Sequence, residues 1–170
     1  RTLIDALADD PRADTANCGV TGPSMGGYAS YLAFADIPEL RAAVPMIGIP
    51  TFTERWLDLL DECAFSDEGW AAALRQVEAQ TAAHTAFIRE IDPAERLRGA
   101  APRALLMMNC DFDTDQPKLY AVRCYRDLEP YYRTCPEQLR LRIYPAAHVV
   151  TPDMERDAAE WLVQHLLQGG

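Results

Sequence analysis

The sequence is poor in serine, in histidine and in positive charge. It has three serines and three histidines in 170 residues, and its 16 lysines and arginines are outnumbered by 26 aspartates and glutamates, for a formal net charge of −10. Nucleic acids and anionic membrane surfaces are bound by a clustered basic face, so this charge disfavours both as partners. A neutral or cationic small molecule suits the charge better.

Two further features are missing, paired cysteine ligands and long apolar runs. The five cysteines lack the C-x-x-C spacing of a metal site, so we expect reduced thiols in a cytosolic protein. No apolar run approaches the roughly 20 residues of a membrane span, and no secretory signal is visible. We therefore expect one cytoplasmic domain, since a chain of this length is enough for a single sizeable core.

The segment Asn17 to Tyr28, NCGVTGPSMGGY, has the pattern of a strand, a sharp turn and a helix. Gly22 lies two residues before Ser24, and Gly26 lies two residues after it. Because glycine has no Cβ, neither residue obstructs a sharp turn of the backbone at Ser24. The Ser24 hydroxyl then lies at the N-terminus of the following helix, whose free N–H groups favour the negative charge of an acyl-transfer intermediate. Ser24 is therefore a candidate nucleophile, and an ordinary glycine-rich turn is the alternative.

Strand and helix patterns alternate along the whole chain. The second strand is continuously apolar, which is typical of a parallel strand covered on both faces, and the third has the clearest pattern of a buried strand. The period-two alternation of the fourth predicts an edge strand. We predict an α/β fold, a parallel sheet flanked by helices, with ligands at the carboxyl ends of the strands. The predicted strands are 18–21, 42–47, 103–109 and 139–144, and the predicted helices are 1–9, 28–35, 117–132 and 152–167.

The stretch from Thr51 to Arg98 is helical in pattern and longer than a crossover between parallel strands requires. It predicts a helical cap insertion over about 51–98 of the single domain. One helix is expected over 70–81. A second is expected to open at Asp92 with a capping box closed by Glu95. The leucines and aromatic residues of this stretch are interpreted as packing residues.

A serine nucleophile needs a histidine to take its proton and a carboxylate to orient that histidine. His148 lies in a loop just beyond the last strand, so it is the candidate general base. His84 falls within the cap. His165 falls on the last amphipathic helix, where a satisfied or solvent-facing imidazole is the ordinary interpretation.

Three alternating aspartates, Asp111, Asp113 and Asp115, follow the third strand. An EF-hand-like calcium loop starting at Asp111 would need glycine at its sixth position and glutamate at its twelfth, where the chain has Gln116 and Val122. We therefore expect no metal and no organic cofactor. One aspartate is expected to orient His148, and the others to cap the helix that begins near Pro117.

These segments together resemble the α/β-hydrolase superfamily, in the neighbourhood of the dienelactone hydrolase-like and prolyl oligopeptidase-like serine esterases and peptidases. The order serine, aspartate, histidine is the order of that fold. DTANCGVTGPSMGGYAS resembles its nucleophile elbow, LLMMNCDFDTDQP its acid loop and IYPAAHVVTPDM its histidine loop. Aligning Pro117 with the proline of the family's acid loop implies that Asp113 is the acid, with Cys110 where glycine is usual and Gln116 where valine is usual.

The resemblance extends over the C-terminal half of the family's fold, so the chain lacks the first strands of that sheet. One of the family's missing loops donates an oxyanion N–H, and the backbone N–H of Met25 is the donor that this chain supplies. The resemblance therefore implies that the sheet is completed by an upstream segment or by a second copy of the chain.

The function implied is that of a serine hydrolase of the carboxylesterase type, which cleaves a small-molecule ester through an acyl-enzyme. Ser24 attacks, His148 shuttles the proton, Asp113 orients His148, and the Met25 N–H forms part of the oxyanion hole. A prolyl oligopeptidase-like serine peptidase is one alternative. A noncatalytic half-domain that acts in binding or assembly is the other.

Overall fold

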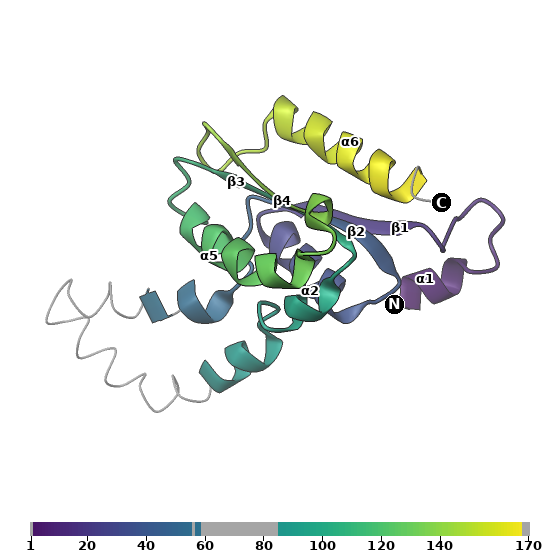
Figure 1. Cartoon of the computed structure of the whole chain (residues 1–170), viewed down its shortest axis with the longest axis horizontal. Helices are drawn as coiled ribbons and strands as arrows, with labels where there is room; N and C mark the ends of the chain where they lie inside the picture. The colour runs from purple at the N-terminus through teal and green to yellow at the C-terminus, as the bar shows by residue number, and fades with distance from the viewer. Residues whose placement is uncertain (1, 56, 59–84, 168–170) are drawn as a thin grey trace, which may run out of the picture.

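The structure is a computed structural model that describes residues 2–55, 57–58 and 85–167. Its four described strands form one parallel sheet in chain order, so the predicted α/β architecture is confirmed (Figure 1). The strands are β1 (Cys18–Pro23), β2 (Leu40–Met46), β3 (Ala104–Cys110) and β4 (Leu139–Tyr144). The named helices are α1 (Thr2–Leu7), α2 (Met25–Asp36), α5 (Lys118–Leu128) and α6 (Pro152–Leu167), with short 3-10 turns η1 (Arg96–Ala100), η2 (Glu129–Tyr132) and η3 (Pro136–Gln138).

Helices cover both faces of the sheet. α6 lies along one face, and α2 and α5 lie along the other (Figure 1). All seven residues of β3 are buried. Because side chains alternate along a strand, Leu105 and Met107 enter the core under α2 and α5, while Leu106 and Met108 enter the core under α6.

The two outer strands differ from the two central ones. β4 is an edge strand, as its alternating pattern predicts. Its polar face is covered only at the end of the strand, where the Tyr144 hydroxyl donates a hydrogen bond of 2.6 Å to Asp157 of α6. Arg140 on the same face is exposed, and so is Ile143 on the other face. β1 is the opposite edge. Within the described residues it pairs with β2 alone, and alternate residues along it are exposed.

Several element boundaries differ from the prediction for local reasons. α2 begins at Met25, directly after Ser24, rather than at Tyr28. The helix predicted over 117–132 is divided, and its last turn is the 3-10 turn η2, because Pro130 has no backbone N–H to continue an α-helix. Pro45 is the second-last residue of β2, near the strand's end as expected.

The cap insertion is described only at its two ends. Residues 52–55, 57–58 and 85–91 are helical, and the helix predicted over 70–81 lies outside the described residues. Asp92 caps the turn that follows it, as predicted, because its Oδ1 accepts the Ala94 backbone N–H at 3.1 Å. The described contacts include no hydrogen bond by which Glu95 would complete the capping box, and Glu95 Oε2 instead pairs with Arg98. The Asp92 carboxylate also accepts hydrogen bonds of 2.8 Å from the Thr51 hydroxyl and from the Thr53 backbone N–H. Asp92 therefore ties the end of the insertion to its beginning.

Cysteines and membrane spans complete the comparison with the sequence. The four described cysteines are free thiols, as predicted: Cys18 and Cys135, which are half-buried, and Cys110 and Cys124, which are buried. Within the described part of the chain, no helix has both the length and the apolarity that crossing a bilayer demands.

Candidate active site

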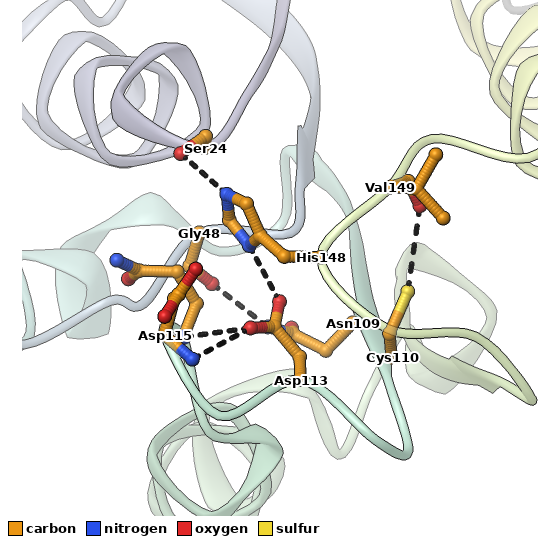
Figure 2. Close-up of polar contacts among 9 residues, drawn as sticks. Ser24, Gly48, Asn109, Cys110, Asp113, Asp115, His148 and Val149 are labelled. Carbon is orange, nitrogen blue, oxygen red and sulfur yellow. Dashed lines mark hydrogen bonds and ion pairs between the residues drawn. The ribbon is translucent and has the colours of Figure 1, made fainter.

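Ser24 lies on the sharp turn between β1 and α2 and has a strained backbone. Its φ of 54° and ψ of −116° are values that residues other than glycine rarely adopt. Two backbone hydrogen bonds hold the turn, one of 2.9 Å from the Ser24 N–H to the Met46 carbonyl and one of 3.1 Å from the Tyr28 N–H to the Ser24 carbonyl. Figure 2 shows the Ser24 side chain directed toward the histidine loop. The predicted strand, sharp turn and helix are therefore present.

The glycines around Ser24 are not equally constrained. A Cβ on Gly22 would lie 2.8 Å from the backbone of Gly26, which agrees with the prediction. At Gly26 a Cβ would meet only the Pro23 side chain, at 3.4 Å. The prediction that the turn needs a residue without a Cβ at position 26 is therefore wrong. The close approach missed by the sequence analysis is at Gly27, where a Cβ would lie 2.6 Å from the Met46 carbonyl oxygen.

His148 connects Ser24 to Asp113 by two hydrogen bonds (Figure 2). Its Nε2 lies 2.9 Å from Ser24 Oγ, and its Nδ1 lies 2.8 Å from Asp113 Oδ2. A carboxylate only accepts hydrogen bonds, so this geometry fits the tautomer with the proton on Nδ1, in which Nε2 accepts from the serine hydroxyl. The three side chains singled out from the sequence are thus brought together in the order that proton transfer from serine requires.

Asp113 is held more rigidly than the two aspartates beside it. Its side chain is fully buried, and its Oδ1 accepts backbone hydrogen bonds of 3.0 Å from Asp115 and 2.8 Å from Gln116. Asp111 is instead ion-paired with Lys118 at the surface. The prediction that Asp111 and Asp115 cap α5 is wrong, because no side chain caps this helix. The backbone N–H groups just before α5 instead donate to Asp113.

The end of β3 holds the histidine loop in place. The buried Cys110 thiol donates to the Val149 carbonyl at 3.6 Å, and the Phe112 N–H donates to the Ala146 carbonyl at 3.0 Å. Burial raises the pKa of the Cys110 thiol, which keeps the proton that this hydrogen bond needs. Both contacts flank His148, so the acid loop positions the loop that carries the base.

Exposed apolar side chains lie next to each member of this hydrogen-bonded chain. Met25 follows Ser24 and is 81% exposed, Phe112 precedes Asp113 and is 65% exposed, and Val149 follows His148 and is 53% exposed. Phe112 and Val149 were not predicted from the sequence to be part of the site. Met25 is also the first residue of α2, where a backbone N–H has no acceptor within the helix.

The residues of the site that could hold a metal ion are Asp113, Asp115 and His148. One ligand atom from each lies within 4.8 Å of the others. The two oxygens of Asp113 and the two ring nitrogens of His148 already make the hydrogen bonds described above. A cation would therefore have to displace contacts that orient the histidine.

Among the described residues, His148 is the histidine that contacts Ser24. His84 lies outside the described residues. His165, on α6, packs against Trp161 with ring centroids 4.2 Å apart, and its Nε2 is buried without a hydrogen-bond partner among the described residues. His165 as a whole is half-buried, so its imidazole is partly exposed to solvent although Nε2 is not. Burial, together with the charge of Arg140, lowers the pKa of His165.

No family model and no curated protein matches the sequence. Solved structures do match its fold. Acetyl xylan esterase 1 from Thermoanaerobacterium sp. JW/SL YS485 aligns with a TM-score of 0.62 and 18% identity over 95% of this chain and 50% of its own. Acylaminoacyl peptidase from Pyrococcus horikoshii aligns with a TM-score of 0.66 and 20% identity over 96% of this chain and 26% of its own.

A third match is the alpha/beta hydrolase GrgF from Penicillium sp. sh18, with a TM-score of 0.66 and 14% identity over 97% of this chain and 69% of its own. The chain thus spans half of the esterase and about a quarter of the peptidase. At these identities the likeness concerns the fold. The chain has the α/β-hydrolase fold, represented by its C-terminal part, as the sequence resemblance implied.

Proposed function

We propose that the chain carries the catalytic triad of a serine hydrolase that cleaves carboxylic esters through an acyl-enzyme. The observation that carries this proposal is the pair of hydrogen bonds from Ser24 through His148 to the buried Asp113. The strained turn at Ser24 adds support, because such strain concentrates at functional sites. The solved structures of similar fold include esterases as well as a peptidase.

Each group has a defined role in the proposed reaction. Ser24 Oγ attacks the ester carbonyl while its proton passes to His148 Nε2, and the tetrahedral oxyanion accepts a hydrogen bond from the Met25 N–H. The C–O bond then breaks, and His148 returns the proton to the leaving alcohol. Water, deprotonated by His148, attacks the acyl-enzyme in the same way and releases the carboxylic acid.

Asp113 stabilises the imidazolium that forms in both half-reactions. Its side chain is fully buried, so the attraction between carboxylate and imidazolium is little screened by water. It also holds the proton on Nδ1, which leaves Nε2 ready to accept from Ser24. Met25, Phe112 and Val149 are proposed to contact the apolar part of the substrate, since each is an exposed apolar residue adjacent in the chain to Ser24, Asp113 or His148.

Labelling with a fluorophosphonate probe tests the proposal directly. In the full encoded protein, the probe is expected to modify Ser24, and Ser24→Ala is expected to abolish both labelling and the hydrolysis of p-nitrophenyl acyl esters. Ser30→Ala is the matched control, because Ser30 is a buried helix serine bonded to the Gly26 carbonyl at 2.7 Å. Labelling that survives in Ser24→Ala would falsify the assignment.

A peptidase of the prolyl oligopeptidase type is the alternative that the solved structures also support, since acylaminoacyl peptidases are among them. The same triad serves both reactions, so the difference lies in the leaving group. Turnover of peptide p-nitroanilides faster than that of p-nitrophenyl esters at equal substrate concentration would favour the peptidase. Absence of any labelling would favour the noncatalytic half-domain.

We also propose that the open edge of β1 is paired with a further strand, from an upstream segment or from a second copy of the chain. Alternate residues of β1 are exposed, whereas β2 and β3 are covered on both faces. An unpaired edge presents N–H and C=O groups to any available strand. The greater length of the aligned structures supports an upstream segment over a second copy.

A further inference from the structure

We propose that Asn109 is a positioning residue for the nucleophile and that it acts through Gly48. The inference rests on the proposed function, because it takes Ser24 to be the reacting serine. Asn109 is fully buried near the end of β3, and it does not touch Ser24 directly in any contact described. Its effect has to pass through the residues that follow β2.

The three residues after Pro45 form a brace between the Ser24 turn and β3. The Met46 carbonyl accepts the Ser24 N–H at 2.9 Å, and the Ile47 N–H donates to the Met108 carbonyl of β3 at 2.7 Å. Ile47 has a φ of 42°, which is unusual for a β-branched residue. A conformation of this kind persists only where surrounding contacts impose it. The brace is therefore a constrained element and not a relaxed loop.

Gly48 is the part of the brace that touches the turn most closely. A Cβ at this position would lie 2.9 Å from the Ser24 carbonyl oxygen, from the Gly27 carbonyl carbon and from the Tyr28 nitrogen. The backbone of Gly48 is thus in direct contact with the turn that holds Ser24. Any shift of Gly48 is transmitted to the nucleophile.

Asn109 fixes the position of Gly48. Its Nδ2 donates a 2.9 Å hydrogen bond to the Gly48 carbonyl (Figure 2). Its Oδ1 is buried and has no hydrogen-bond partner among the described residues. A buried acceptor without a partner lowers stability, so Asn109 is a poor choice for stability alone. It is the polar exception in an otherwise apolar, wholly buried strand.

Asn109 and its neighbour Cys110 hold opposite halves of the site. Successive side chains of a strand point to opposite faces, and here Cys110 reaches Val149 beside His148 while Asn109 reaches Gly48 beside Ser24 (Figure 2). The end of β3 therefore positions His148 through Cys110 on one face and Ser24 through Asn109 on the other. The 2.9 Å approach of His148 to Ser24 depends on both contacts.

The test is Asn109→Leu, a substitution of similar size that lacks the donor. The wild type has one buried acceptor without a partner among the described residues, Asn109 Oδ1, and the variant would have one as well, the Gly48 carbonyl. The Tm is therefore expected to stay near that of the wild type. The rate of fluorophosphonate labelling of Ser24 in the full encoded protein is expected to fall by about 10- to 10²-fold, because small displacements of reacting groups are costly. The pH profile of labelling is expected to keep its midpoint, since the pair of His148 and Asp113 is unchanged.

Met107→Leu is the matched control, because Met107 lies on the same face of β3, is fully buried and is replaced by a residue of similar volume. It is expected to label at the wild-type rate. Wild-type labelling in Asn109→Leu would overturn the inference while leaving Ser24 as the nucleophile. The inference would also be overturned if the labelling rate of Asn109→Leu fell only in proportion to its fraction of folded protein.

Failure of the wild type to label is a different outcome, because it removes the proposed function on which the inference depends. If Asn109→Leu does not fold, Asn109→Ser decides the question with the same measurements. The serine side chain is too short to reach the Gly48 carbonyl, and it adds no apolar bulk to the site. A folded Asn109→Ser that labels as fast as the wild type overturns the role given to Asn109.

Discussion

Nε2 of His148 lies 2.9 Å from Oγ of Ser24, although the two residues are 124 positions apart in the chain. The loops after β1, β3 and β4 supply Ser24, Asp113 and His148 in turn, because the carboxyl ends of parallel strands meet at one edge of the sheet. β2 supplies none of these three residues. Its C-terminal residues instead support the Ser24 turn, through the Met46 carbonyl.

The acid loop offers a comparison among three aspartates. Asp113→Asn is expected to lower kcat by up to about 10⁴-fold, because the amide no longer selects the Nδ1–H tautomer of His148. Asp111→Asn and Asp115→Asn are expected to have small effects, since Asp111 is paired with Lys118 and Asp115 contacts Asp113 through its backbone N–H. Steady-state ester hydrolysis by the three variants measures this, and a larger loss in Asp111→Asn would contradict the assignment.

The proposed role of Met25 resides in its backbone. Met25→Ala keeps the N–H that is proposed to bind the oxyanion, so kcat is expected to stay within a few-fold of the wild type. KM for substrates with long acyl chains is expected to rise, because the 81% exposed side chain is lost from the apolar surface beside Ser24. A large fall in kcat with an unchanged KM would argue against a backbone role. A series of p-nitrophenyl esters of increasing acyl length provides the measurement.

Two adjacent glycines are expected to respond in opposite ways to the same substitution. In Gly27→Ala the new Cβ would lie 2.6 Å from the Met46 carbonyl oxygen, so the helix has to move and the free energy of unfolding is expected to fall by about 1–3 kcal/mol. In Gly26→Ala the nearest atom is 3.4 Å away, and alanine in a helix is better than glycine by about 0.5–1 kcal/mol. Urea denaturation of both variants checks the contrast, which fails if Gly26→Ala is the less stable protein.

His165 is expected to make stability depend on pH. Burial lowers its pKa in the folded state from the ordinary value of 6.5, so the folded protein holds this imidazole neutral where the unfolded chain protonates it. The unfolded state then binds more protons, and the free energy of unfolding falls as the pH drops below about 6.5 toward the folded-state pKa. His165→Phe removes this contribution and retains the aromatic contact with Trp161.

Urea midpoints of the wild type and of His165→Phe, compared between about pH 8 and about pH 5, measure that contribution as a difference. The other two histidines are present in both proteins, so their titration cancels in the comparison. Equal loss of stability in the two proteins over this range would show that His165 is not the group responsible.

The open edge of β1 leads to a prediction for the 170 residues expressed alone. They are expected to self-associate, as measured by light scattering, because an unpaired strand edge can pair with another chain. They are also expected to hydrolyse esters slowly, because loss of one oxyanion donor costs roughly 10²- to 10³-fold in rate. The outcome that contradicts this is a stable monomer with turnover at ordinary esterase rates, about 1 to 10³ per second. If an upstream strand pairs with β1, a longer chain that includes that strand is expected not to associate.

The elements that were predictable from the sequence are those with a local physical cause. Glycines around Ser24 permit a sharp turn, and Gly22 is indeed too close to Gly26 for a side chain. The buried strand β3 was likewise evident from neighbouring residues, because Ala104 to Met108 are all apolar. The choice of Asp113 among three aspartates was different, because it required an alignment with a known family.

A parallel α/β sheet, a sharp serine turn and a histidine beyond the last strand were predictable from the residues alone, because strand periodicity and glycine sterics act between residues close in the chain. Only the tertiary structure decided that Asp113 is the buried aspartate, that Gly27 and not Gly26 lies against β2, and that Asn109 reaches Gly48. Each of these depends on a contact between segments far apart in the chain. Such contacts are set by how strands and helices pack, and the local pattern shows which face of an element is buried but not which distant residue it meets.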